Sequence, residues 1–256
     1  MIIDAHIHLD KYEEQKRQKI LERLFEQEIE ALIAVSVDLP SCIKNQSFSF
    51  EDTRIKAAFG FHPEQEIPSI TEMDKLFVWM EEHVNDMVAV GEVGLPYYKK
   101  VDSQNSLDYE PYIQLLERFM SFAAKWQKPI VLHAVYEDAQ IVCDLLEKHH
   151  IKKAHFHWFK GDNTVLNRMI ESGYFISITP DCLYEDEIQQ LIRQYPLEKM
   201  MVETDGPWPF EGPFKGQQTE PKMIIESIRK IALLKHLSVE ETTKKLYENT
   251  KQFYEI

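Results

Sequence analysis

The sequence predicts an α/β fold, a (β/α)8 TIM barrel, on two observations. Eight strand-like apolar segments alternate with amphipathic stretches along the 256 residues, as in a barrel whose parallel strands are each followed by a helix. Many of these segments are nearly continuous apolar runs, which is typical of parallel strands covered on both faces. This length suits one large domain or two small ones. Because no repeat or linker interrupts the alternation, we expect one domain over residues 1–256.

The expected elements are read from apolar runs for strands and from helical spacing of apolar residues for helices. The strands are expected at 2–8, 31–37, 55–61, 88–93, 130–133, 154–157, 175–178 and 200–204. Helical spacing occurs at 20–29, 107–126, 139–149 and 185–195. Ser238 and Glu241 form a plausible capping box for a terminal helix, although two surface residues would show the same spacing. An open doubly wound sheet is the alternative fold, and the absence of G-x-G-x-x-G and Walker motifs disfavours its usual nucleotide-binding version.

The first expected strand carries a pair of histidines at its end. His6 and His8 are two residues apart, so they point to the same face of a strand. Two imidazoles directed at one point are ligands that suit a divalent transition metal. A solvated or core-packed pair is the structural alternative for this motif taken alone.

Four further ligand-type residues end later strand-like runs, and they strengthen the metal interpretation. They are Glu92, His133, His157 and Asp205. Barrel sites are built at the carboxyl ends of the strands, where these residues fall. A carboxylate at position 92 can bridge two cations, and the adjacent glycines permit close approach of the backbone. Asp205 can bind metal and accept the proton of an attacking water.

Three other residues near these strand ends have open roles. His155 and His157 share a face, so the register is ambiguous; we prefer His157 as the ligand because it lies nearer the strand end, which leaves His155 in a lower layer. Glu203 lies one layer below Asp205, where a buried hydrogen-bonding role is expected. His62 could contact a substrate oxygen, stabilise charge or move a proton, or it could be a loop histidine with none of these roles.

Composition limits the kinds of partner. The formal net charge of −14 argues against a broad basic surface for duplex DNA or an anionic membrane. It does not exclude a nucleic-acid substrate, since two divalent ions would add positive charge at the site itself.

Three widely spaced cysteines without a C-x-x-C motif favour free thiols in a reducing cytoplasm. No apolar run is long enough to span a bilayer, and the acidic start of the chain is unlike a secretory signal. We therefore expect a cytoplasmic protein, and the sequence gives no signal for its oligomeric state.

Six motifs in order resemble the TatD family of metal-dependent hydrolases. They occupy residues 4–10, 60–63, 91–95, 129–133, 157–161 and 203–207, and the match runs from residue 1 to about 249. The resemblance implies an amidohydrolase-like TIM barrel, a dinuclear metal site and deoxyribonuclease-type phosphodiesterase activity. It implies that one metal is held by His6, His8 and Asp205, that the second is held by His133 and His157, and that Glu92 bridges them. The resemblance also implies that Asp205 and Glu92 are catalytic, and that His62 is a substrate-contacting or catalytic residue.

Two departures from the family pattern concern substrate positioning. Family members commonly have Asp where this chain has Pro96, and Arg where it has Val135. Neither change removes an expected metal ligand, so the resemblance supports the metal site more firmly than it supports a DNA substrate. The aromatic residues of the loop 207–214 could stack unpaired bases or could simply cap the barrel, and the segment 97–100 could flank a phosphate.

We therefore expect a metal-dependent hydrolase that uses two divalent ions, with zinc suited to the imidazole ligands and manganese or magnesium also admissible. DNA strand ends or a small phosphoester are the expected substrates. A small-molecule amidase, lactonase or phosphoesterase on the same site is the alternative. A metal-containing scaffold without enzymatic activity is the third hypothesis.

Overall fold

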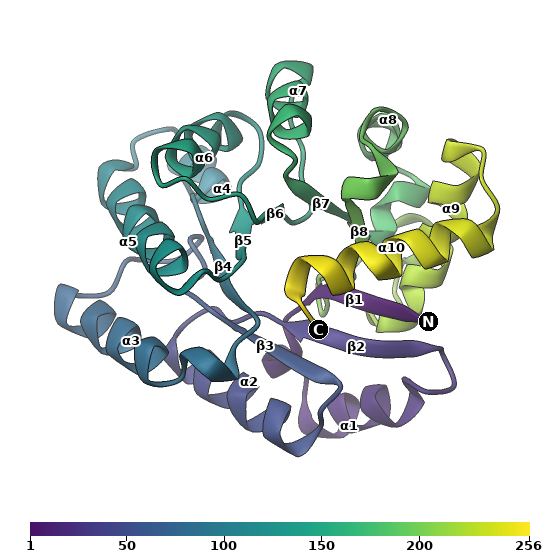
Figure 1. Ribbon diagram of the computed structural model, residues 1–256, viewed down its shortest axis with the longest axis horizontal. Helices are drawn as coiled ribbons and strands as arrows, with labels where there is room; N and C mark the ends of the chain where they lie inside the picture. The colour runs from purple at the N-terminus through teal and green to yellow at the C-terminus, as the bar shows by residue number, and fades with distance from the viewer.

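Eight parallel strands form the barrel that the sequence predicts, and the computed structural model describes residues 1–256 (Figure 1). The strands pair in chain order from β1 to β8, and each neighbouring pair is parallel. Their bounds are β1 Ile2–Ile7, β2 Ile29–Ala34, β3 Ile55–Phe59, β4 Ala89–Gly94, β5 Ile130–His133, β6 Ala154–Phe156, β7 Phe175–Ile178 and β8 Met200–Val202. The expected TIM barrel is confirmed, and the open doubly wound sheet is wrong, because its strand order would not follow the chain.

The barrel closes between β8 and β1 through contacts at their carboxyl ends. The backbone N–H of Asp205 donates to the carbonyl of His6 at 2.9 Å, and that of His8 donates to Gly206 at 2.8 Å. The Asp4 carboxylate accepts the backbone N–H of Thr204 at 3.0 Å. This closure fixes residues from the two ends of the chain against each other, where the first and last expected metal ligands lie.

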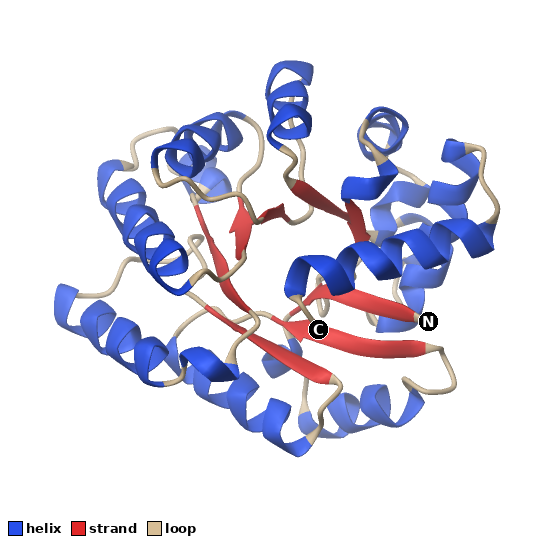
Figure 2. Ribbon diagram, in the orientation of Figure 1, coloured by secondary structure: helices blue, strands red, loops and turns tan.

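Helices surround the strands on the outside of the barrel (Figure 2). They are α1 Glu14–Arg23, α2 Leu39–Glu51, α3 Ile70–Glu82, α4 Tyr97–Asp102, α5 Glu110–Trp126, α6 Glu137–Lys148, α7 Asn163–Ser172, α8 Asp186–Gln194, α9 Ile224–Lys235 and α10 Val239–Tyr254. The main apolar core lies between the strands and these helices, with Leu32, Phe59 and Phe119 among its buried members. No helix is long and apolar enough to cross a bilayer.

Two helix boundaries test the sequence reasoning directly. The capping box at the start of α10 is confirmed: Ser238 Oγ accepts the N–H of Glu241 at 3.1 Å, and the Glu241 carboxylate accepts the N–H of Ser238 at 3.1 Å. The expected helix at 20–29 is wrong at its end, because α1 stops at Arg23 and Ile29 begins β2. The helical spacing continued across the intervening turn by chance, and Phe25 in that turn is 87% exposed.

Several strands end earlier than expected. The segments 2–8, 31–37, 55–61, 154–157 and 200–204 each run one to three residues past the observed strand. Their last residues fall outside the regular strand pairing, although single backbone hydrogen bonds continue, such as that from the N–H of His157 to the carbonyl of Leu132 at 3.2 Å, and they lead into the loops at the carboxyl end of the barrel. His8 and Asp205 therefore lie on loop backbone just beyond β1 and β8, whereas Glu92 and His133 lie within β4 and β5.

The amino end of the barrel is filled by apolar residues of the strands and by the end of α10. Ala5, Ala31 and Ala58 belong to a buried cluster inside the barrel together with Phe253 and Tyr254. Figure 1 shows α10 crossing the strands, with the C-terminus beside β1 and β2. Because this end is packed with side chains, the polar site can open only at the carboxyl end, as is general for this fold.

Candidate metal centre

Glu92 lies at the centre of the polar cluster, on β4, with no exposed surface. Its position depends on close packing between β4 and β5. A Cβ atom at Gly94 would lie 1.9 Å from the carbonyl oxygen of His133, and one at Gly91 would lie 2.6 Å from the Cβ atom of Val131. Only glycine fits at these two positions, which allows the strand carrying Glu92 to approach the strand carrying His133.

The first lobe of the centre gathers around Oε2 of Glu92, and we define it as His6, His8 and Asp205. The Nε2 atoms of His6 and His8 lie 3.2 and 3.3 Å from that oxygen. The same two nitrogens lie 3.4 and 3.3 Å from Oδ1 of Asp205. Two imidazoles and two carboxylates thus surround one small volume at the seam between β1 and β8.

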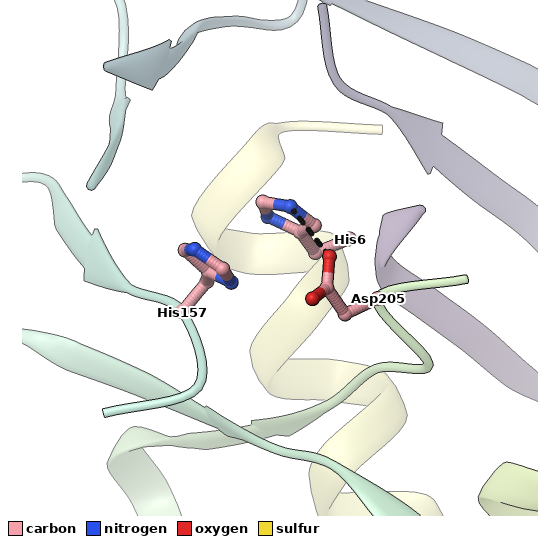
Figure 3. Close-up of side chains that lie close together, drawn as sticks. All are labelled: His6, His157 and Asp205. Atoms are coloured by element: carbon pink, nitrogen blue, oxygen red, sulfur yellow. Dashed lines mark ion pairs between the residues drawn. The ribbon is translucent and has the colours of Figure 1, made fainter. Parts of the chain in front are cut away.

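The second lobe gathers around Oε1 of Glu92, and we define it as His133, His157 and His62. The distances to that oxygen are 3.1 Å from Nδ1 of His133, 2.7 Å from Nε2 of His157 and 3.3 Å from Nε2 of His62. The two carboxylate oxygens of Glu92 therefore face different histidine groups. Figure 3 shows the boundary between the lobes, where the ring of His157 lies opposite His6; the two rings stack with centroids 3.9 Å apart.

Unsatisfied buried atoms show that the centre fits a metal. Both ring nitrogens of His6, Oε2 of Glu92 and Oδ1 of Asp205 are buried without a hydrogen-bond partner. Leaving such atoms unpaired costs free energy unless another group satisfies them. Three groups of residues each bring their possible ligand atoms within 4.8 Å of one another. The groups are His6, His157 and Asp205; His6, His8 and Glu92; and His62, Glu92 and His133. Imidazole nitrogens and carboxylate oxygens suit zinc or manganese.

The charges of the centre are mutually dependent. Burial opposes protonation of His8, but the hydrogen bonds and charges of Asp205 and Glu92 outweigh it and raise the pKa of His8 to about 10. Burial also opposes ionisation of Glu92, yet the surrounding histidines, His157 foremost, hold its pKa well below the usual value. Without metal the carboxylates thus stay ionised beside protonated imidazole. A bound cation would take the place of these protons.

His62 is arranged as a hydrogen-bond donor. The backbone N–H of Glu64 donates to its Nδ1 atom at 3.2 Å, which leaves the ring proton on Nε2. That Nε2 atom faces Oε1 of Glu92. Burial lowers the pKa of His62, so the neutral ring is favoured. Its geometry suits donation to an oxygen in the centre.

Glu64 is a part of the centre that the sequence reasoning missed. Its Oε1 atom lies 3.1 Å from Nε2 of His133, on the other side of the ring from Glu92. The backbone N–H groups of Tyr98 and Lys99, at the start of α4, hold the carboxylate at 2.9 and 2.8 Å. Its signal in the sequence was slight: a carboxylate two residues after His62, in the same loop.

His155 lies one layer below the centre, and His157 lies in it. The ring of His155 contacts the hydroxyl of Tyr254 at 2.8 Å and that of Ser177 at 2.6 Å. Ser177 in turn donates to Glu203, whose other oxygen accepts the backbone N–H of Trp158 at 2.8 Å and lies 3.6 Å from Nδ1 of His157. This chain of polar contacts runs from α10 to the ring of His157, so both His155 and Glu203 support the centre from beneath.

The loop 207–214 divides into a packed part and an exposed part. Phe210 and Phe214 are buried in a small cluster with Met223, which is a capping role. Trp208 is 57% exposed and meets the ring of Trp158 edge-on at 6.0 Å. The two departures from the family pattern, Pro96 and Val135, are both buried, so neither offers a polar atom at the surface of the site.

The chain matches known proteins over its whole length. The family described as TatD related DNase matches residues 3–255. An uncharacterized metal-dependent hydrolase of Haemophilus influenzae is 40% identical over 258 residues, covering 100% of both chains. Human deoxyribonuclease TATDN3 is 26% identical, covering 99% of this chain and 94% of the human protein. The crystal structure of YJJV, a TatD homologue from Escherichia coli, superposes with a TM-score of 0.87 at 22% identity, covering 100% of this chain and 98% of that one.

Proposed function

The chain belongs to the TatD-related DNase family of metal-dependent hydrolases, and from that premise we propose that it hydrolyses phosphodiester bonds of DNA at a centre of two divalent cations. The observation that carries the proposal is the placement of Glu92, whose two carboxylate oxygens face two separate groups of histidines. We propose that residues 1–256 act as one domain, which is supported by the continuous sheet from β1 to β8.

In this proposal the first lobe, His6, His8 and Asp205, holds one cation, and His133 and His157 hold the other. Glu92 bridges them. The support for this division is that each lobe contains its own oxygen of Glu92 within 3.3 Å of its imidazole nitrogens. Zinc suits the imidazole-rich donors, and manganese suits the mixed nitrogen and oxygen set.

The remaining chemistry comes from the side chains. Bound divalent cations would lower the pKa of a water molecule and polarise a phosphoryl oxygen. Asp205 is ionised in the structure's charge arrangement, because the histidines outweigh the effect of burial and lower its pKa, so it can accept the proton of that water. His62, with its proton on Nε2, can donate a hydrogen bond to a phosphoryl oxygen and stabilise the charge that develops there.

A small-molecule substrate is the second candidate. The lysines after β4 are engaged: Lys99 lies 2.6 Å from Glu66, and Lys100 lies 3.5 Å from Glu137. These lysines therefore offer little net positive charge for binding a long polyanion. An amidase, lactonase or phosphoesterase that acts on a small ester or amide would use the same centre. Human TATDN3, named a deoxyribonuclease, favours DNA.

The experiment that tests the proposal is cleavage of end-labelled single-stranded DNA with added Zn²⁺, Mn²⁺ or Mg²⁺. We expect metal-dependent cleavage by the wild type and at least a 100-fold loss of kcat in Glu92→Gln, which keeps the shape of the side chain and removes its charge. Ser69→Ala is the control, since Ser69 is exposed at the start of α3 and its side chain contacts Glu72 and no residue of the centre. Absence of cleavage by the metal-loaded wild type, together with hydrolysis of a small ester or amide, would establish the second candidate instead.

A further inference from the structure

Two exposed aromatic rings stand at opposite sides of the metal centre. Tyr98 follows β4 and is 46% exposed, and Trp208 follows β8 and is 57% exposed. Because the eight strands pair in chain order around a barrel, β4 and β8 lie across from each other. Both rings follow the carboxyl ends of their strands, Tyr98 in the first turn of α4 and Trp208 in the loop after β8. They therefore rise on opposite sides of the mouth that contains Glu92.

Each ring is supported by a neighbour of the centre. The Tyr98 ring lies 6.1 Å from the ring of His133, and the backbone N–H of Tyr98 is anchored by Glu64. Trp208 packs edge-on against Trp158, which follows His157 in the chain. Trp158 is itself fixed by hydrogen bonds from its indole N–H to Asp181 at 2.6 Å and from its backbone to Glu203. The two exposed rings are thus held in place by their neighbours.

The lysines around the carboxyl end of the barrel are all paired with carboxylates. Every lysine in the segments that follow β1, β4, β6 and β8 has a carboxylate within 4 Å; the pairs are Lys11 with Asp10, Lys99 with Glu66, Lys100 with Glu137, Lys160 with Asp181, Lys215 with Glu211 and Lys222 with Glu220. Nucleic-acid affinity in most proteins comes from lysine and arginine contacts to phosphates. Here each of those lysines lies beside a carboxylate, so these segments offer little net positive charge, and we expect the binding of a strand to draw on another source.

From these observations we propose that Tyr98 and Trp208 form a clamp for the two bases that flank the cleaved phosphate, so that an unpaired nucleic-acid end is held by stacking on these two rings rather than by lysine contacts to its phosphates. This inference rests on the proposed phosphodiesterase function. Stacking on aromatic side chains tolerates any base, because every base presents a flat ring. A duplex would not offer its bases to the two rings, so an unpaired end is required.

The test compares an oligothymidylate with matched strands that lack the bases of the two terminal nucleotides at one end or the other. In the wild type we expect removal of the bases to lower kcat/KM by about 5- to 150-fold per lost stacking contact. Tyr98→Ala and Trp208→Ala should each lower kcat/KM for the intact strand by a similar factor and leave that for the matching abasic strand unchanged. Tyr98→Phe and Trp208→Phe keep a ring and should retain most of the activity. Phe25→Ala is the matched control, since Phe25 is an exposed ring before β2, at the amino end of the barrel.

Binding supplies a readout that is independent of hydrolysis. Quenching of tryptophan fluorescence by the oligothymidylate, measured in chelator, should be lost in Trp208→Phe. We also expect KM to rise by only about 3-fold between 50 and 200 mM salt, as for about one phosphate contact. Equal activity on intact and abasic strands, with unaffected alanine variants, would overturn the clamp and leave the phosphodiesterase standing. No hydrolysis of any strand would overturn the phosphodiesterase, and the quenching experiment would still decide whether the clamp exists.

Discussion

The carboxylate of Glu64 lies 3.1 Å from Nε2 of His133, on the side of the ring that faces away from Glu92. A histidine that binds metal through one nitrogen is commonly oriented by a carboxylate at the other. Glu64 is itself held by two backbone N–H groups of α4, so it can fix the direction in which Nδ1 of His133 points. This relationship connects the loop after β3 with the second lobe.

We predict that Glu64→Ala weakens binding of the second cation by about 10- to 100-fold, because the ring of His133 loses its orientation. Glu64→Gln, which can still accept hydrogen bonds, should fall between the alanine variant and the wild type. Titration calorimetry of the metal-free protein with Zn²⁺ or Mn²⁺ measures this. Glu66→Gln is the control, since Glu66 is an exposed partner of Lys99. Equal affinities in all four proteins would show that Glu64 has no positioning role.

Removal of metal should destabilise the fold. A cation that binds only the native state at 100 times its Kd adds about 2.7 kcal/mol of stability. For a chain of this size that corresponds to a Tm lower by about 5–10 °C in chelator. Differential scanning calorimetry with and without chelator measures the change. The shift should be much smaller in Glu92→Gln, and an undiminished shift in that variant would place the stabilising cation elsewhere.

The stability of the fold should depend on pH through Asp138. Burial raises the pKa of this carboxyl to about 6, above its usual value near 4, and Tyr109 donates to it at 2.5 Å. Because the folded state holds this proton more tightly, the contribution is present below about pH 4 and is lost as the pH rises through about 6.

The Asp138→Asn variant isolates that effect, since its side chain stays neutral. The free energy of unfolding of the wild type minus that of the variant should fall by about 2 kcal/mol between pH 4 and pH 7. Urea unfolding at a series of pH values gives both quantities. Parallel profiles for the two proteins would contradict the raised pKa.

The contribution to stability of the polar contacts beneath the centre can be tested without changing a residue of the centre. Tyr254→Phe removes the hydroxyl that contacts His155 and the carbonyl oxygen of Ala5. We expect a loss of about 1–3 kcal/mol in the free energy of unfolding, because buried polar groups are left unpaired. Metal stoichiometry should stay unchanged. A variant that unfolds like the wild type but loses metal would instead show that α10 controls the centre directly.

Local patterns in the sequence were sufficient for the barrel and for which residues meet at its carboxyl end. Strand periodicity and apolar runs predicted eight parallel strands, and His6, His8, Glu92, His133, His157 and Asp205 were recognised as ligand-type residues at strand ends; the structure brings all six together. This worked because side-chain direction along a strand has a period of two, and because parallel strands of a barrel end at one face.

Other features required the tertiary structure. The placement of His157 in the centre and of His155 beneath it depended on the height of β6 in the barrel, and the contact of Glu64 with His133 depended on the loop after β3 meeting the start of α4. The loop 207–214 placed Phe210 inward and Trp208 outward. These outcomes follow from contacts between segments far apart in the chain, and such contacts are fixed by closure and packing of the whole barrel rather than by any local pattern.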